Sequence, residues 1–177
     1  IPEDLQRQLY GEIYNHSLWL INLVENLLSM SQLEDGRLRI RPSSEPLADI
    51  VADALCHINR ISIDHNITVV HQDKCMLVKA DPRLMAQVLI NIIDNAIQYT
   101  PKGSDIRIET KRLDKYAQVT IADNGAGIPD EMKPHVFEMF YTRSHNIPDS
   151  RRGLGLGLSL CQSIITAHGG TITVEDN

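Results

Sequence analysis

The segment from Asp81 to Tyr99 constrains the fold most strongly, because its sequence predicts one helix with two chemically different faces. Asp81 is a suitable N-cap, and Pro82 suits the first helical position. A rotation of about 100° per residue gathers the polar side chains within one arc of about 100°. These polar side chains are Gln87, Asn91, Asp94, Asn95 and Gln98. The other side is apolar and carries Met85, Val88, Leu89, Ile92, Ile93, Ala96 and Ile97.

The polar face of this helix carries amides, whereas a solvated face usually carries Glu, Lys and Arg. Amides offer neutral oxygens to a hard cation and donors to phosphate oxygens. The one carboxylate among them, Asp94, is suited to accept a proton or to orient water. An ordinary solvated face is the alternative explanation of this pattern.

Helical and extended patterns alternate along the rest of the chain. Helices are predicted at Asp4–Leu33, Leu47–Ile61 and Gly155–Ala167. Extended segments are predicted at Leu38–Ile40, Ile67–Val70, Met76–Val78 and Thr171–Val174, with a hairpin of Ile106–Leu113 and Tyr116–Ala122, and Pro42–Pro46 is predicted as a connector. This order predicts an α+β fold in which helices cover one face of a mixed sheet, a two-layer α/β sandwich.

The first predicted helix is long and contains no Pro. Its apolar seam follows alternating steps of three and four through Ile13, His16, Leu20, Leu23, Leu27 and Met30. Such a seam is typical of a helical bundle and favours a dimer, although an amphipathic helix packed on its own domain gives a similar pattern. Asp35-Gly36 ends the helix. We therefore predict a partial helical domain at residues 1–36 and a second domain at 37–177.

Composition limits the classes of partner. The net charge of -6 argues against a nucleic-acid surface. Cys56, Cys75 and Cys161 are scattered, which fits reduced cytosolic thiols. No apolar run approaches the roughly 20 residues of a membrane span, so membrane attachment is expected only through segments outside this sequence.

Two glycine-rich segments follow the amide-faced helix. Asp123-Asn124-Gly125-Ala126-Gly127 comes directly after a predicted strand, where glycines let the backbone approach a ligand and Asp123 is suited to accept from an exocyclic amine. Everyday turns have similar compositions. Gly153–Leu158 opens a helix, and free N–H groups there bind phosphate. The second segment lacks the Lys of a Walker loop and the spacing of a Rossmann fingerprint.

These segments together resemble the catalytic domain of histidine kinases, in the ATPase superfamily shared with DNA gyrase, Hsp90 and MutL. The matching segments are the N box at Asn91–Tyr99, the first glycine box at Asp123–Gly127, the F box at Phe137–Phe140, the second glycine box at Gly153–Gly157, and the usual ending at Gly169-Gly170-Thr171. The resemblance covers Leu47–Asn177 and implies a Bergerat-type ATP-binding fold. The first helix resembles the second helix of the dimerisation and phosphotransfer domain. The stretches Leu27–Leu38 and Gly155–Ile172 are most similar to Kdp-type potassium sensor kinases.

The resemblance implies a role for each box residue. Asp123 is expected to hold the adenine amino group, and Asn95 to ligate a Mg²⁺ ion that bridges the phosphates, with Asn91 in support. Asp94 stands at the position of the general base or of the residue that orients the acceptor histidine. Further ATP-binding residues are expected to be Gln98, Tyr99, Gly125, Gly127, Ile128, Arg143, Gly153, Leu154, Gly155, Leu156 and Gly157. Phe137 and Phe140 are expected either to anchor a lid of roughly Tyr141–Leu154 or to be ordinary core aromatics.

Two residues depart from the family pattern. Gln98 stands where many relatives have Lys, which removes one positive phosphate contact, and Leu154 stands where Thr is common. His16 is predicted as a seam residue and not as the phosphoacceptor, because Ser17-Leu18 follows it where an acidic residue is usual. His168 is predicted to lie at a helix end, where it interacts with the helix dipole.

The sequence therefore predicts a protein-histidine kinase module that binds ATP and Mg²⁺ and donates the γ-phosphoryl group to a histidine outside this sequence. The resemblance implies a homodimer, a response regulator as recipient, and a cytoplasmic location in a membrane-anchored sensor. The alternative is a nucleotide sensor with weak or no catalysis, which Gln98 and Leu154 favour. A purely structural interaction protein leaves Asn95 and Asp123 unexplained.

Overall fold

The computed structural model describes residues 2–34, 40–58, 64–141 and 155–177. The chain forms two compact units. The first unit comprises Ile1–Arg39 and Val136–Leu160, and the second comprises Ile40–His135 and Cys161–Asn177. The sheets and the amide-faced helix belong to the second unit.

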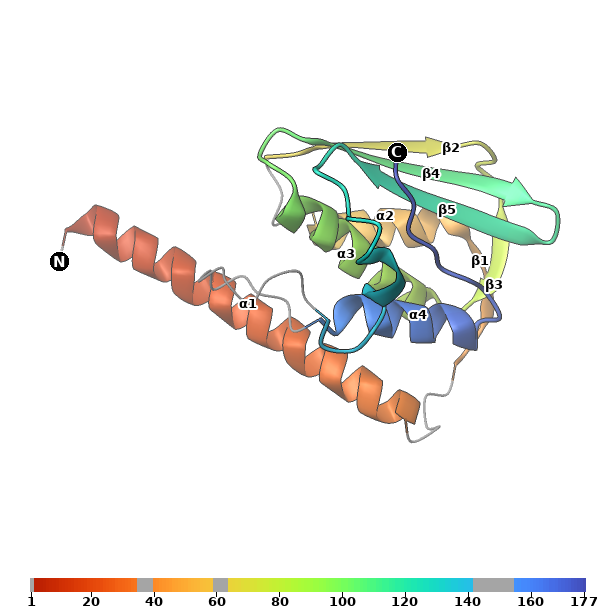
Figure 1. Cartoon of the computed structure of the whole chain (residues 1–177), viewed down its shortest axis with the longest axis horizontal. Coiled ribbons are helices and arrows are strands. Elements are labelled where there is room, and N and C mark those ends of the chain that lie inside the picture. The colour runs from red at the N-terminus through yellow and green to blue at the C-terminus, as the bar shows by residue number, and fades with distance from the viewer. Residues whose placement is uncertain (1, 35–39, 59–63, 142–154) are drawn as a thin grey trace. The chain divides into compact units, whose positions relative to one another are not determined.

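Helix α1 (Glu3–Glu34) is one uninterrupted helix, which confirms the prediction for Asp4–Leu33 (Figure 1). Large apolar side chains are exposed along it: Leu5, Leu9, Tyr10, Ile13, Tyr14, Leu20, Ile21, Val24, Leu27 and Leu28. Of the predicted seam, Ile13, Leu20 and Leu27 are in this exposed set, and the side chains of Leu23 and Met30 lie outside the described part of the structure. A helix that exposes this much apolar surface needs a partner surface.

A mixed three-stranded sheet forms the framework of the second unit. Strand β2 (Asn66–His71) pairs in parallel with β4 (Asp105–Leu113), and β4 pairs antiparallel with β5 (Tyr116–Asp123). The predicted hairpin is confirmed, and Asp114 takes the left-handed conformation in its turn, with φ 47°. From Asp105 to Lys111 of β4, the inward side chains are buried and the outward ones are exposed or half-buried, as expected for a sheet covered on one face.

Helices α2 (Leu47–Ile58) and α3 (Pro82–Tyr99) cover one face of this sheet (Figure 1). The core between the layers consists of Ile50, Val51, Ala54 and Ile58 from α2, Leu89 and Ile93 from α3, and Ile108 from β4. Side chains of β2 and β5, among them Val69 and Ile121, pack against this cluster. The predicted two-layer α/β sandwich is therefore confirmed.

Two predictions of extended structure were wrong. Ser43–Pro46 is strand β1, paired antiparallel with β3 (Leu77–Ala80), although Pro42 before it and Pro46 at its end indicated a connector. Pro46 is tolerated because it ends an edge strand, where its missing N–H breaks no ladder. Thr171–Val174 is not a strand. The end of the chain is held by side-chain contacts of Asp176 and Asn177 instead. Of the strand predicted at Leu38–Ile40, the first two residues lie outside the described ones.

Helix α4 (Gly157–Ala167) returns the chain to α3, and a short 3₁₀ helix, η1 (Lys133–His135), precedes it in sequence. The Cys161 thiol is buried and donates to the Val88 carbonyl of α3 at 3.7 Å. The free thiol at this position acts as a small apolar side chain in the core.

Asp81 joins three separate segments at the start of α3. Its Oδ1 accepts from the backbone N–H groups of Arg83 and Leu84, at 3.2 and 3.3 Å, as an N-cap does. Its Oδ2 accepts from the N–H of Arg41 at 3.1 Å, and its own N–H donates to His168 Nε2 at 3.0 Å. His168 Nδ1 donates to the Ile164 carbonyl at 2.8 Å, which places this histidine at the end of α4 as predicted.

Replacing Asp81 with Ala should lower the free energy of unfolding by about 2–3 kcal/mol, because one cap is lost and the Arg41 N–H loses its acceptor. Urea unfolding followed by circular dichroism measures this loss. Asp53, exposed on α2, provides the control, and Asp53→Ala should change stability by no more than about 0.5 kcal/mol. Equal stabilities of the two variants would contradict the assigned role of Asp81.

Candidate functional site

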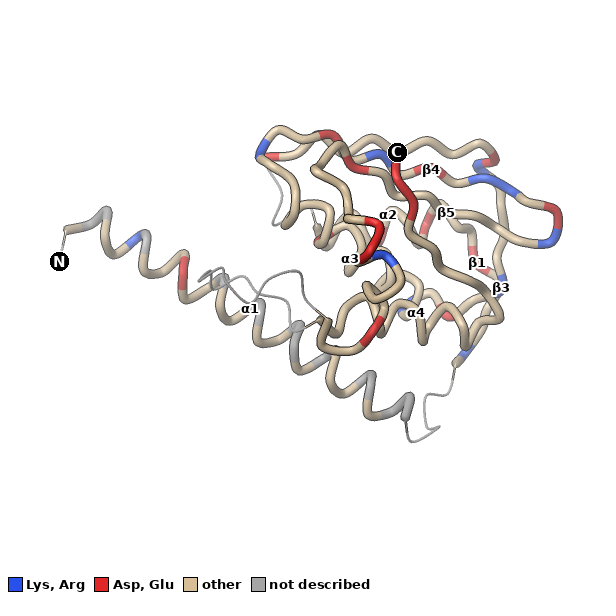
Figure 2. Tube along the Cα trace, viewed as in Figure 1, with Lys and Arg blue, Asp and Glu red and all other residues tan. Residues whose placement is uncertain are grey.

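The polar face of α3 is nearly uncharged, and the helix is drawn tan over most of its length in Figure 2. Asn91, Asp94 and Asn95 are half-buried, and Gln98 and Tyr99 are exposed. An ordinary solvated face carries long charged side chains that reach into water. This face instead carries short amides that are partly buried, so it is not an ordinary solvated face.

Asn91 retains a donor that the fold does not use. Its Nδ2 is buried and has no hydrogen-bond partner among the described residues. Burial raises the pKa of the neighbouring Cys161 thiol to about 12, and the Asn91 amide opposes that shift by favouring the thiolate. The amide is thus near the sulfur, but the two do not meet the geometry of a hydrogen bond, so the donor remains unpaired. A buried unpaired amide is costly, which fits a position completed by a polar ligand.

Asp94 lies one helical turn from Asn91 and beside Asn95. Desolvation by burial raises its pKa from the ordinary 3.8 to about 6. Within the described ranges, neither the carboxylate of Asp94 nor the amide of Asn95 has a recorded hydrogen bond or ion pair. A carboxylate with a pKa near neutrality and no structural partner is suited to exchange a proton with a bound group.

The glycine loop, Asp123–Gly127, packs directly on the C-terminal end of α3. Asp123 Oδ1 accepts from the N–H of Gly125 at 2.9 Å, which turns the chain sharply after β5. A Cβ on Gly125 would lie 2.8 Å from Thr100 Cγ2 and 2.8 Å from Asp123 Oδ1, so any larger residue would have to displace both side chains. The structure thus brings the glycine loop and the amide-faced helix together, although they are far apart in sequence.

Asn124 and Gly127 complete this loop. Asn124 Oδ1 accepts from the Asp105 N–H at 3.0 Å, and Gly127 takes the left-handed conformation with φ +69°. Ile128, which follows, is half-buried. The second carboxylate oxygen of Asp123 has no recorded partner in the described part of the chain, which leaves it able to accept from a ligand.

Thr100 is a site residue that sequence reasoning missed. It caps the C-terminus of α3, and its hydroxyl donates to the Ala96 carbonyl at 2.7 Å. Because that proton is used, the same oxygen accepts from His65 Nε2 at 3.1 Å. The methyl group of Thr100 is the surface on which Gly125 rests. Its only sequence signal was a Thr directly after a helix.

The second glycine box is hydrogen-bonded to the F box within the first unit. Phe140 N–H donates to the Gly155 carbonyl at 3.0 Å, and a Cβ on Gly155 would lie 2.6 Å from the Tyr141 carbonyl oxygen. Phe140 has φ 62° and is 65% exposed, so it is not a core aromatic, whereas Phe137 is half-buried. Leu156 is buried and Gly157 starts α4. Arg143, Gly153, Leu154 and the lid predicted after Tyr141 lie outside the described residues.

Two features are absent from the described residues. No group of three or more His, Cys, Asp or Glu is arranged to hold a metal ion there. None of the helices in that part of the chain is long and apolar enough to cross a membrane.

Comparisons with known proteins agree with this geometry. Residues 80–177 match the family described as histidine kinase-, DNA gyrase B-, and HSP90-like ATPase. The chain is 39% identical over 172 residues to the sensor protein KdpD of Clostridium acetobutylicum, covering 97% of this chain but 19% of that protein. The chain thus spans about a fifth of that relative.

Solved structures show the same fold. The catalytic domain of histidine kinase ThkA superposes with a TM-score of 0.69 at 26% identity, over 77% of this chain and 88% of that one. ThkA in complex with the response regulator protein TrrA superposes with a TM-score of 0.74 at 23% identity, over 100% of this chain and 49% of that one. The second likeness concerns the fold alone.

Proposed function

Because the chain belongs to the family of histidine kinase-, DNA gyrase B-, and HSP90-like ATPases, we propose that it is the catalytic module of a sensor histidine kinase. It transfers the γ-phosphoryl group of ATP to a histidine outside these 177 residues. The contact of Gly125 with Thr100 carries the proposal, since it brings the Asp123 loop against the helix of Asn91, Asp94 and Asn95. The predicted family resemblance, Kdp-type kinases included, is confirmed by the family match and by KdpD.

The nucleotide is recognised by the two elements that meet at this contact. Asp123 accepts from the adenine amino group with its second carboxylate oxygen, and Gly125 and Gly127 allow the backbone to approach the base. Asn91, Gln98, Tyr99 and Ile128 are further nucleotide-binding residues in this proposal, as the family resemblance implies. Asn95 would hold Mg²⁺ through its amide oxygen, and the ion would supply neutralisation of the phosphate charge. Phosphate binding by Arg143, Gly153, Leu154, Gly155, Leu156 and Gly157 stays a prediction from the family resemblance.

The transfer step needs a base close to the acceptor imidazole. One imidazole nitrogen attacks the γ-phosphorus with its lone pair, the bond from phosphorus to the β–γ bridging oxygen breaks, and ADP leaves. The proton on the other ring nitrogen becomes acidic as the N–P bond forms, and Asp94 orients the ring and accepts that proton. A pKa of about 6 keeps Asp94 ionised at neutral pH yet more basic than an ordinary Asp.

The proposed protein partners are a second copy of the chain and a response regulator. Residues 1–36 form the second helix of a dimerisation and phosphotransfer domain, residues 37–177 form the catalytic domain, and the exposed apolar side chains of α1 assemble a homodimeric bundle. A response regulator receives the phosphoryl group, as the solved complex of ThkA with TrrA suggests by its partner. The full-length protein is a membrane-anchored sensor with this module on the cytoplasmic side.

Radiolabelled ATP tests the activity. With Mg²⁺ and the separate phosphotransfer domain of a Kdp-type kinase, the chain should label that domain and not itself, and the label should be stable in alkali and lost in acid. The same domain without its acceptor histidine provides the control and should stay unlabelled. The chain could bind ATP but fail to label an acceptor domain that a known kinase labels. That result would favour the nucleotide sensor over the kinase as the function of this chain. Absence of ATP binding would overturn both functions.

A further inference from the structure

The last two residues of the chain contact the glycine loop. Asn177 Nδ2 donates to the Asp123 carbonyl oxygen at 2.6 Å. Asp176 Oδ1 is the nearest recorded atom to the position that a Cβ would take on Gly127, at 3.9 Å. Residues 176 and 177 therefore contact the loop at its first residue, Asp123, which is proposed to bind adenine, and at its last, Gly127.

Lys133 links this C-terminal segment to the chain that follows the loop. Its Nζ is 2.5 Å from Asp130 Oδ1 and 2.5 Å from Asp176 Oδ2. The Lys133 side chain is only 19% exposed, although the side chains of Asp130 and Asp176 are 92% and 65% exposed. An isolated surface ion pair contributes little to stability. A lysine side chain that is mostly covered and ends between two carboxylates instead fixes where two segments lie, here residues 130–133 and 176–177.

We propose that Lys133, Asp176 and Asn177 form a clasp that holds the glycine loop in the conformation that binds the adenine nucleotide. This inference rests on the proposed function, because it assigns positioning residues to the same site. Asn177 fixes the carbonyl of Asp123, one bond from the Cα that carries the adenine-binding carboxylate. A loop with two glycines samples many conformations when nothing holds it, and ordering it on binding weakens affinity. The clasp orders the loop in advance.

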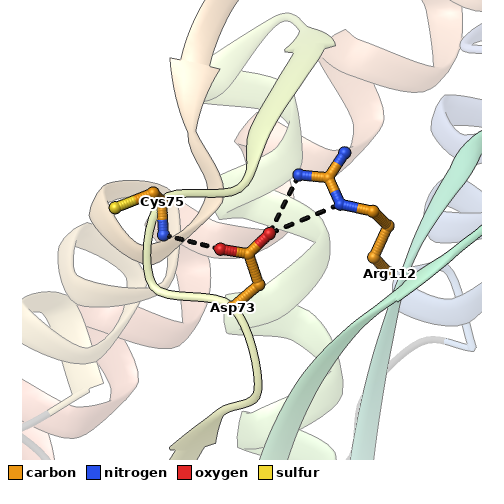
Figure 3. A network of polar contacts seen from close by, with 3 residues as sticks. All are labelled: Asp73, Cys75 and Arg112. Carbon is orange, nitrogen blue, oxygen red and sulfur yellow. Dashed lines mark hydrogen bonds and ion pairs between the residues drawn. The ribbon is translucent and has the colours of Figure 1, made fainter.

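The chain offers a matched control at the other end of the β4–β5 hairpin. Asp73 accepts from the Cys75 N–H at 3.0 Å and from Arg112 NH2 at 2.9 Å (Figure 3). Arg112 pairs with Ala117, whereas Asp123 pairs with Ile106, so this ion pair lies at the opposite end of both strands. Asp73→Asn and Asp176→Asn each remove one negative charge and one ion pair, but only the second touches the clasp.

Calorimetric titration with Mg-ADP tests the clasp in the 177-residue chain. Asn177→Asp keeps the side-chain size, removes the donor and places a carboxylate against a carbonyl, so the dissociation constant should rise about fivefold to tenfold. Asp176→Asn and Lys133→Met should each raise it about threefold, Lys133→Arg should restore it, and Asp73→Asn should leave it within about twofold. Thermal midpoints should stay close to that of the wild type throughout.

Amide hydrogen exchange provides a second measurement without nucleotide. The N–H of Gly125 should exchange faster in Asn177→Asp than in the wild type, and at the wild-type rate in Asp73→Asn. Unchanged ADP affinity and unchanged exchange in the clasp variants would overturn the clasp and leave the proposed function intact. A wild-type chain that does not bind ADP would overturn the proposed function, and the clasp with it.

Discussion

Replacing Asp94 with Asn is expected to slow phosphoryl transfer to the acceptor histidine by about 10²–10⁴-fold, the range measured for the loss of a positioned general base. The substitution keeps the shape of the side chain and removes its ability to accept a proton. Because Asp94 is proposed to act on the acceptor imidazole and not on the nucleotide, the affinity for Mg-ADP should stay within about threefold. Single-turnover labelling of a supplied acceptor domain measures the transfer rate, and Asp53→Asn on α2 provides the control.

The pH dependence of the rate gives an independent signature. In the wild type, transfer should become faster as pH rises through about 6, where Asp94 ionises, and then level off. The Asp94→Asn variant should lack that step. A wild-type profile that is flat from pH 5 to 8, or a variant that transfers as fast as the wild type, would exclude Asp94 as the base.

The raised pKa of Asp94 also has a consequence for stability. The folded protein holds this proton up to about pH 6, whereas the unfolded chain releases it near the ordinary value of 3.8. Folding therefore becomes progressively less favourable as the pH rises from about 3.8 to about 6. The total loss is at most about 3 kcal/mol, and less because the half-buried carboxylate retains some water. Asp94→Asn should accordingly be more stable than the wild type at pH 8 and similar to it at pH 4. Gain of stability with loss of activity is typical of a functional residue.

The elements that the sequence predicted correctly are those whose signals are local. The cap at Asp81, the apolar face that packs Leu89 and Ile93 against β4, and the hairpin about Asp114 each depend on residues within one or two turns of chain. The amide face of α3 could be predicted from the sequence for the same reason, because the helical spacing of its polar residues is a property of one segment.

The contacts that assemble the site join segments far apart in sequence. Nothing near Thr100 indicates that Gly125 will rest on its methyl group, and nothing near Asn177 indicates that its amide will bind the Asp123 carbonyl. The wrong predictions have the same origin. Ser43–Pro46 becomes a strand because Leu77–Ala80 offers an edge to pair with. Thr171–Val174 has the β-branched residues of a strand but pairs with no strand in the described structure.

Asp123 should decide which purine the site accepts. Wild-type chain should bind ADP at least about tenfold more tightly than inosine diphosphate, because the hypoxanthine base presents a carbonyl where adenine presents an amine that donates to the free Asp123 oxygen. In Asp123→Asn, the amide oxygen keeps the Gly125 N–H bond and the amide nitrogen faces the base. That nitrogen donates and does not accept, so ADP binding should weaken about 10–100-fold and inosine diphosphate binding should improve.

The reversal of preference separates recognition of the base from general damage to the loop. Titration of both nucleotides into the wild type, Asp123→Asn and the control Asp73→Asn provides the comparison. A distorted loop would weaken both nucleotides by similar factors, since both share the same ribose and phosphates. Loss of a carboxylate that accepts from the amino group should instead change the ratio of the two dissociation constants. An unchanged ratio in Asp123→Asn would therefore exclude Asp123 from the nucleotide site.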